Sequence, residues 1–191
     1  PHQGTPGGSG SRSGMTALWR RVFCFPVASA SALAGLAVLT ARSRFNDPDL
    51  WWHLRTGQII WNSRAIPRTD LLSFTTGQHG WVPHEWLAQL TMYAAWLVAG
   101  PSGLMLWFCL LAAALLVNQF VLCCLYCGNA KIAFLGALIT WFFSTIGLAV
   151  RPHMVGYTLL VCELLVLHLG RSRARRWYFL LPLLFAIWGN S

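Results

Sequence analysis

The segment Asn46–Glu85 gathers most of the side chains in this chain that could carry acid–base or metal chemistry. Asp47 and Asp49 are separated by a single residue, which lets two carboxylates bind one hard divalent cation such as Mg²⁺ or Mn²⁺. Either carboxylate could also act as the base that activates an acceptor hydroxyl. The competing interpretation is that the pair caps a helix and lies in a solvated turn.

Histidines give the same segment a second possible chemistry. His53, His79, His84 and Glu85 could together form a zinc site. However, His84-Glu85 is not followed by a second histidine at the spacing of the metalloprotease pattern H-E-x-x-H. We therefore expect His53, His84 and Glu85 to hold a substrate or to tie the segment together.

Three further polar residues lie outside this segment, at the edges of apolar runs. The planar guanidinium of Arg151 suits a lipid-linked phosphate. An arginine at a membrane boundary can also simply extend its charge toward water, which is the alternative. His153 and Asn190 are the other candidates for substrate binding.

The elements that must position these residues follow from composition. The chain of 191 residues is 56% hydrophobic and only 10% charged, whereas soluble domains carry roughly 25% charge. Its mean hydropathy is +0.54, and it contains several apolar runs of about 18 residues or more, the length that crosses a bilayer. The sequence therefore predicts an all-α fold, a polytopic bundle of transmembrane helices in a lipid bilayer.

The net charge of +9 does not indicate a nucleic-acid partner. The arginines stand in small clusters beside apolar runs, where they orient the chain and face anionic lipid headgroups. The six cysteines lie in or beside apolar runs and lack the paired spacing of a zinc or iron–sulfur site. We interpret them as packing residues.

The chain is expected to begin with a tail and to continue as one membrane domain. Residues 1–14 are rich in Gly and Ser and should be disordered. Residues 15–191 should form a transmembrane domain, the N-terminal part of a longer protein. Its first span is predicted at Val22–Ala41. Ala28-Ser29-Ala30 resembles a signal-peptide cleavage site, but the apolar stretch continues past it, which favours an anchor.

A long loop, residues 42–102, is predicted after the first span. It should contain two helices at the membrane surface, Leu50–Trp61 and Glu85–Ala99. The second is apolar but short for a span, and it is bounded by Pro83 and by Gly100-Pro101. Four more spans complete a set of about five. They are expected at Gly103–Tyr126, Ile132–Val150, Met154–Leu169 and Trp177–Trp188.

Arginine placement predicts the orientation of the bundle. Cytoplasmic loops are enriched in Arg and Lys, so Arg20-Arg21 and the arginine-rich Gly170–Arg176 should both lie in the cytoplasm. Both clusters reach that side only if Glu85–Ala99 does not cross the membrane. The N-terminus is then cytoplasmic, and all the candidate site residues share the external face.

Taken together, the short motifs of the chain resemble those of a group of bacterial membrane proteins. The motifs are Asp47-Pro48-Asp49-Leu50-Trp51-Trp52-His53-Leu54, Gly57, Ile66-Pro67-Arg68-Thr69-Asp70, Ser73-Phe74-Thr75, His84-Glu85-Trp86-Leu87, Arg151-Pro152-His153 and Trp188-Gly189-Asn190. That group is similar to the GT-C glycosyltransferases, membrane enzymes that use dolichyl- or undecaprenyl-phosphate-linked sugars. The link rests on the architecture and on an acidic motif in the first external loop.

The resemblance implies a function. An integral enzyme of the bacterial plasma membrane would move a sugar from a polyprenyl-phosphate donor to an acceptor on the external face. The acidic motif corresponds to Asp47 and Asp49, one of which would serve as base or metal ligand. The resemblance assigns no role to the other candidates named above, which we expect to bind the substrates on the chemistry of their side chains.

Two other classes of protein compete with this interpretation. The first is a non-enzymatic integral membrane protein, such as an assembly partner or a transporter subunit. An aspartate within a broken span would favour transport, and the sequence shows none. The second is a membrane hydrolase or metalloenzyme that uses the histidines.

Overall fold

The computed structural model describes residues 25–41, 47–73, 79–144 and 148–191. The helices in these ranges are α2 (Phe25–Ala41), α3 (Asp49–Ser63), α4 (Trp86–Cys127), α5 (Ala130–Ser144), α6 (His153–Ser172), the 3₁₀ helix η1 (Arg175–Leu180) and α7 (Leu181–Trp188). The described residues hold no β-strand beyond an isolated antiparallel bridge between Thr69 and Gly80. The all-α prediction is confirmed for these ranges, whereas the expected tail 1–14 lies outside them.

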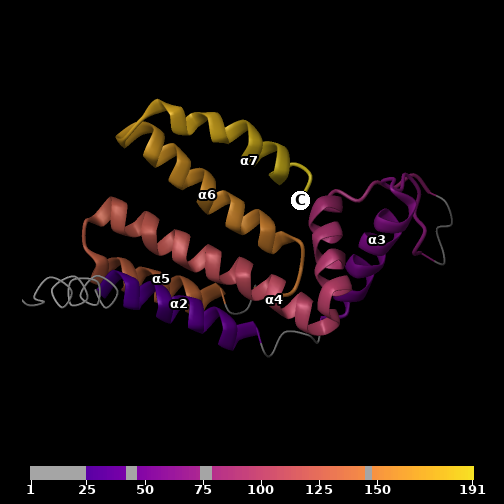
Figure 1. Cartoon of the computed structure of the whole chain (residues 1–191), viewed down its shortest axis with the longest axis horizontal. Helices are drawn as coiled ribbons and strands as arrows, with labels where there is room; N and C mark the ends of the chain where they lie inside the picture. Colours follow the sequence, from indigo (N-terminus) through magenta and orange to yellow (C-terminus); the bar gives the residue numbers. More distant parts are fainter. Residues whose placement is uncertain (1–24, 42–46, 74–78, 145–147) are drawn as a thin grey trace, which may run out of the picture.

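The helices form two groups that differ in direction (Figure 1). α2, α5, α6, α7 and the C-terminal part of α4 run along one another as a bundle. α3 and the N-terminal part of α4 stand together at one end of this bundle. The loop between α4 and α5 and the loop after α6 lie at the opposite end. Each long element therefore connects the two ends.

A sharp break inside α4 separates the two groups. Ala99 (φ −148°, ψ 25°) and Gly100 (φ 56°, ψ −135°) have non-helical backbone angles, and Pro101 follows them. A positive φ suits glycine, which has no Cβ atom, and proline is well accommodated in the first turn of the helix that follows. The boundary predicted at Gly100-Pro101 is confirmed. Residues 86–98 therefore pack beside α3 instead of extending the long helix of the bundle.

The predicted spans agree with the helices in position more closely than in length. α6 covers the span expected at Met154–Leu169 and continues to Ser172. The span expected at Ile132–Val150 is wrong at its C-terminal end, because α5 ends at Ser144 and residues 148–152 lie outside any helix. Pro152 explains part of this, since the residue before a proline is disfavoured in helical conformation.

The last apolar stretch is not the single helix that was expected at Trp177–Trp188. It divides into the 3₁₀ helix η1 and the eight-residue helix α7. Pro182 stands near the start of α7. Its ring lacks an N–H and would clash with the carbonyl four residues earlier in a continuous α-helix, whereas the first turn of a new helix accepts it.

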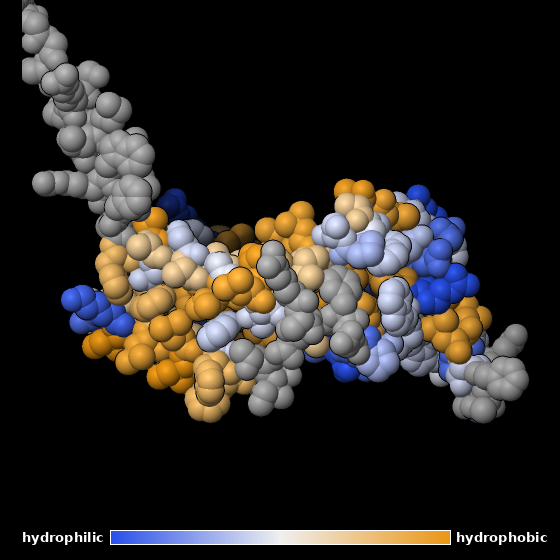
Figure 2. Space-filling view, turned by 90° about the horizontal axis from the view of Figure 1, so that it is seen from below, coloured by the Kyte–Doolittle hydropathy of each residue, from blue (hydrophilic) through white to orange (hydrophobic). Residues whose placement is uncertain are grey.

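Within the described ranges, two helices, α4 and α6, are long and apolar enough to cross a membrane, while α2 and α5 are apolar but shorter. Large apolar side chains on these elements face outward, among them Leu39, Leu106, Leu110, Ile132, Phe142 and Leu160. Figure 2 shows apolar surface over the bundle, with most of the hydrophilic surface at the end that carries α3 and a smaller hydrophilic patch at the opposite end. An apolar exterior with polar ends is typical of helices in contact with lipid. This pattern supports a membrane location for the bundle.

Candidate functional site

Asp47 and Asp49 lie at the start of α3, where the local backbone determines their positions. Oδ1 of Asp47 accepts a hydrogen bond from the backbone N–H of Asp49 at 3.1 Å. The backbone carbonyl of Asp47 accepts another from Leu50 at 3.2 Å. Carboxylates are favourable near the positive end of a helix dipole. Asp47 thus contacts the first residue of α3, but Pro48 occupies the N-cap position and no side chain there makes a capping hydrogen bond. Asp47 also has a contact with a distant part of the chain.

That further contact is the guanidinium of Arg151, which comes from the turn before α6. Nε of Arg151 donates to Oδ2 of Asp47, and Nη2 donates to Oδ1 at 2.9 Å. One edge of the guanidinium thus binds both oxygens of Asp47. Nη2 also lies 2.8 Å from Oδ2 of Asp49. Arg151 and Asp47 are 104 positions apart in the chain, and with Asp49 they form one compact acidic–basic cluster.

Asp47, Asp49 and Arg151 differ in how much of each side chain is exposed to solvent. Asp47 exposes 11% of its side chain, Arg151 37% and Asp49 44%. The hydrogen bond from Arg151 lowers the pKa of Asp47 below its ordinary value, and the same bond raises the pKa of Arg151. A carboxylate with a lowered pKa is a weaker proton acceptor. Asp47 is therefore a partner for Arg151, and Asp49 is the accessible carboxylate.

A second polar cluster joins α3 to the N-terminal part of α4. His53 is only 4% exposed. Its Nδ1 lies 3.2 Å from Nε2 of Gln89 and 3.8 Å from a carboxylate oxygen of Glu85. With the Gln89 amide in this orientation, Nε2 of Gln89 donates and Nδ1 of His53 accepts, which puts the proton of the neutral ring on Nε2. Burial lowers the pKa of His53 to about 4, so this histidine is uncharged at neutral pH.

Gln89 is the residue of this cluster that motif-based reasoning missed. Its side chain is buried, and its Oε1 has no hydrogen-bond partner in the described part of the chain. A signal was present in the sequence, because Gln89 is a lone amide in an apolar run. It also follows Glu85 by four residues, which places both on one helix face. Its bond to His53 explains why a polar side chain occupies this buried position.

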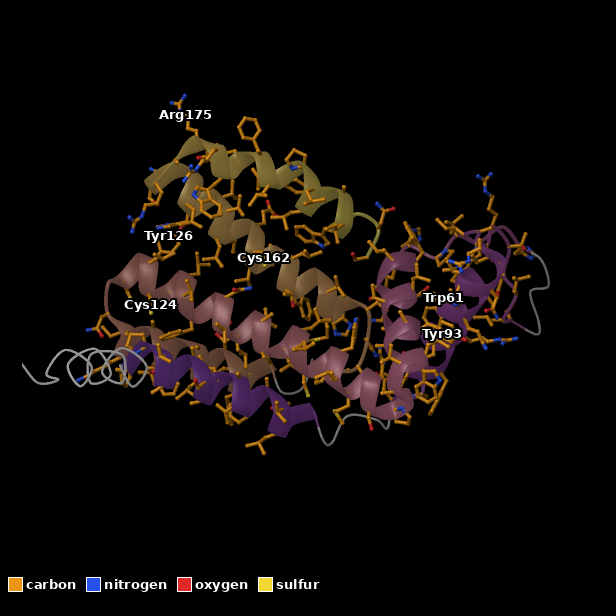
Figure 3. All side chains as sticks on the ribbon, viewed as in Figure 1. Trp61, Tyr93, Cys124, Tyr126, Cys162 and Arg175 are labelled. Atoms are coloured by element: carbon orange, nitrogen blue, oxygen red, sulfur yellow. The ribbon has the colours of Figure 1, made fainter. Side chains whose placement is uncertain are left out.

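Gly57 allows α3 to approach α4 closely enough for these contacts. A Cβ atom at position 57 would lie 2.2 Å from the backbone oxygen of Gln89 and 2.8 Å from Cβ of Tyr93. Farther along the same interface, the rings of Trp61 and Tyr93 meet edge to face with centroids 6.4 Å apart (Figure 3). The glycine thus sets the helix spacing on which the contact between His53 and Gln89 depends.

Replacing Gly57 by alanine is expected to destabilise the protein by about 1–3 kcal/mol, the usual effect of overpacking. The added methyl group would push α3 away from the backbone of Gln89. Gly35→Ala in α2 is the matched control, because nothing lies within 4 Å of a Cβ added there. Thermal melting in detergent provides the comparison. Gly35→Ala should melt no lower than wild type. If Gly57→Ala also melted no lower than wild type, the close approach of Gly57 to the backbone of Gln89 would be contradicted.

The other expected site residues take different places around the clusters. His84 is exposed in the turn before α4, and His153 is partly buried at the start of α6. Asn190 binds the beginning of α4: its Oδ1 accepts from Nε1 of Trp86 at 2.9 Å, and its backbone oxygen accepts from the N–H of Leu87 at 2.9 Å. Asn190 therefore ties the chain after α7 to the site end of the molecule.

The side chains at this site do not match the divalent-cation site expected from the sequence. In the ranges that the structure describes, no group of three His, Cys, Asp or Glu side chains could hold a metal ion. The guanidinium of Arg151 already lies between the carboxylates of Asp47 and Asp49. A divalent cation would have to displace it, so the donor set as arranged does not fit a metal.

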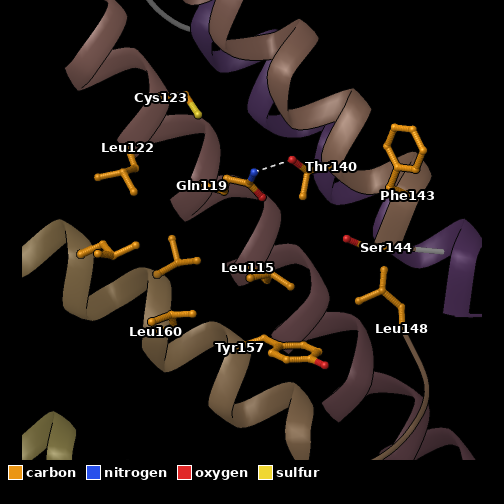
Figure 4. Close-up of a pocket in the computed structure, with 12 residues that line it drawn as sticks. Leu115, Gln119, Leu122, Cys123, Thr140, Phe143, Ser144, Leu148, Tyr157 and Leu160 are labelled. Carbon is orange, nitrogen blue, oxygen red and sulfur yellow. Dashed lines mark hydrogen bonds between the residues drawn. The ribbon is translucent and has the colours of Figure 1, made fainter. Parts of the chain in front are cut away.

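An apolar cavity of about 500 Å³ lies between α4, α5 and α6 (Figure 4). Its main polar contact is a hydrogen bond of 2.6 Å from Nε2 of Gln119 to Oγ1 of Thr140. The lining also includes Leu148 and Tyr157, which flank Arg151 in the chain. The cavity thus provides apolar space beside the turn that carries the guanidinium.

No protein-family model matches this chain, and the comparisons with curated proteins and with solved structures give no match either. The geometry of the two clusters is therefore the basis for the functional proposal.

Proposed function

We propose that the chain belongs to a membrane glycosyltransferase of GT-C type that moves a sugar from a polyprenyl-phosphate donor to an acceptor. α2, the C-terminal part of α4, α5, α6 and η1 with α7 would supply about five crossings of the bilayer. The clusters would then lie on the external side and the N-terminus in the cytoplasm. The observation that supports this function best is the contact of Arg151 with Asp47 and Asp49 at one end of an apolar bundle.

Asp49 is the proposed base in this reaction. It is the more exposed of the two carboxylates, and it can accept a proton from the attacking hydroxyl of the acceptor. Asp47 is a positioning residue, because both its oxygens are bound to Arg151. The buried pair of His53 and Gln89 supports α3, which presents Asp49.

Arg151 is the proposed contact for the donor phosphate, through one nitrogen and not through a full edge. A guanidinium has five N–H groups. The groups on Nε and Nη2 face the two carboxylates. Nη1 has no hydrogen-bond partner among the described residues and can donate to a phosphate oxygen. The neighbouring apolar cavity would accommodate part of the polyprenyl chain and keep water from the activated sugar.

A non-enzymatic membrane protein remains the second candidate, and one observation favours it. Two carboxylates and one guanidinium leave a net negative charge in the cluster, which does not attract a phosphate. In that case the cluster would serve to fasten α3 to the turn before α6. The transferase and the non-enzymatic protein predict different effects of the substitution Arg151→Lys on lipid binding.

Arg151→Lys in the full-length protein is expected to weaken binding of a polyprenyl phosphate about tenfold. Lysine keeps a positive charge for Asp47 but loses the free Nη1 group. The loss of one hydrogen bond to a charged group corresponds to about 1.5 kcal/mol. Lipid affinity is measured in one detergent for wild type and variant, at a temperature well below both melting transitions.

Arg68→Lys is the matched control for this substitution. Arg68 is an exposed arginine in the loop between α3 and α4, so its replacement should leave the lipid affinity unchanged. If wild type bound no polyprenyl phosphate, and Arg151→Lys changed only the melting temperature, the transferase proposal would be refuted and the fastening role supported.

A further inference from the structure

A further pocket lies at the end of the bundle opposite to Asp47 and Arg151. It has a volume of about 440 Å³ and is lined by Tyr126 of α4 and by Leu167, His168, Arg171 and Ser172 of α6. Figure 3 shows Tyr126 and Arg175 at this end, far from Trp61 and Tyr93. The pocket is formed where α4 and α6 both finish, and the proposed transferase chemistry does not involve it.

The charge around this pocket is strongly positive. Arg171, Arg173, Arg175 and Arg176 are all exposed, and none of them pairs with a carboxylate in the described part of the chain. Four of the five acidic residues of the sequence belong to the segment that contains the other site. The fifth, Glu163, precedes Arg171 by about two helical turns. Arg171 therefore faces the pocket with its charge uncompensated.

The other walls of the pocket suit a ligand with an apolar part. The rings of Tyr126 and His168 meet edge to face with centroids 4.8 Å apart. Tyr126 remains 71% exposed and Leu167 39% exposed. Tyrosine is enriched at membrane–water interfaces, and α4 and α6 are both long and apolar enough to cross a bilayer. The pocket thus combines a guanidinium that has no carboxylate partner among the described residues with an aromatic and aliphatic border.

We propose that this pocket binds the phosphate of an anionic phospholipid in the leaflet where α6 ends. Arg171 supplies two N–H groups to the phosphate oxygens, and the ring of His168 supplies a further polar contact. Leu167 and the ring of Tyr126 contact the start of the acyl chains. The proposal requires that α4 and α6 cross a bilayer, and it is independent of the transferase reaction.

Competitive lipid binding to the purified protein tests this proposal. The protein in mild detergent is offered phosphatidylglycerol and phosphatidylcholine in equal amounts, and retained lipids are counted by native mass spectrometry. Wild type should retain phosphatidylglycerol in preference. Arg171→Gln should reduce that preference about fivefold or more, because one basic residue in contact with anionic lipid contributes a factor of about five. Arg173→Gln should reduce it by less than about twofold, because its charge is not held against the bound phosphate. Arg173 is the matched control, because it is exposed on the same segment but does not line the pocket.

Three results would overturn the proposal. An equal loss in Arg171→Gln and Arg173→Gln would mean a diffuse basic surface without a pocket. Displacement of the lipid by inorganic phosphate would mean a site for a free anion. No preference in wild type would mean no anionic lipid site. If Arg171→Gln melted below the assay temperature, His168→Gln would replace it, and an unchanged lipid preference there would also refute the site.

Discussion

Asp49→Asn is expected to lower the turnover of the full-length protein by about 100-fold or more, the scale on which a general base acts. Asparagine keeps the size of the side chain and one acceptor oxygen, but it cannot take a proton from the acceptor hydroxyl. The melting temperature should change little, because Asp49 is the more exposed carboxylate and only one of its oxygens lies near Arg151. Sugar transfer to the acceptor and thermal melting would be measured on the same preparations.

Asp47→Asn is the informative comparison, because it should have the opposite profile. Both oxygens of Asp47 bind Arg151, so this change weakens the attachment of α3 to the turn before α6. We expect a loss of stability of about 1.5–3 kcal/mol, the range for a hydrogen bond to a charged group. Normal turnover of Asp49→Asn with reduced turnover of Asp47→Asn would exchange the proposed roles. Normal turnover of both would favour the non-enzymatic alternative.

Acidification from pH 7 to pH 4 is expected to destabilise the protein through His53 by about 3 kcal/mol. The pKa of this histidine falls from an ordinary value of 6.5 to about 4 in the folded protein. The unfolded chain therefore binds a proton first as the pH falls below 6.5, and stability declines until the pH reaches about 4. Protonation would also place a donor on Nδ1, opposite the donor Nε2 of Gln89.

Melting temperature as a function of pH measures this effect. His53→Gln should remove most of the decline between pH 6.5 and pH 4, because the titrating group is absent. His84→Gln is the matched control, since His84 is exposed nearby, and its decline should remain like that of wild type. Asp47 contributes to the pH dependence only at lower pH. Because its pKa is lowered in the folded protein, the stability that its charge provides is lost only as the pH falls below the ordinary pKa of a carboxyl group. An equal pH dependence in wild type and His53→Gln would contradict the buried neutral imidazole.

The sequence by itself determined the helical class, the apolar character of the bundle and most helix positions. These properties depend on local features, namely the length of an apolar run and the backbone chemistry of glycine and proline. The break at Gly100 and Pro101 follows from such local chemistry, and the structure has it where it was expected. The division at Pro182 is equally local, and it was missed only because the apolar run continues across that proline. Five crossings and the orientation stay predictions.

The tertiary structure alone decided which polar side chains meet. Asp47 and Arg151 were both candidates in the sequence, but their contact depends on the packing of helices that lie between them in the chain. That contact makes Asp47 the partner of Arg151 and leaves Asp49 as the more accessible carboxylate. Gln89 became visible in the same way, because α3 approaches α4 at Gly57 and places His53 against its amide. Composition and spacing identify groups capable of chemistry, whereas the distances that give each group its pKa and its free hydrogen-bonding atoms arise only when separate helices pack together.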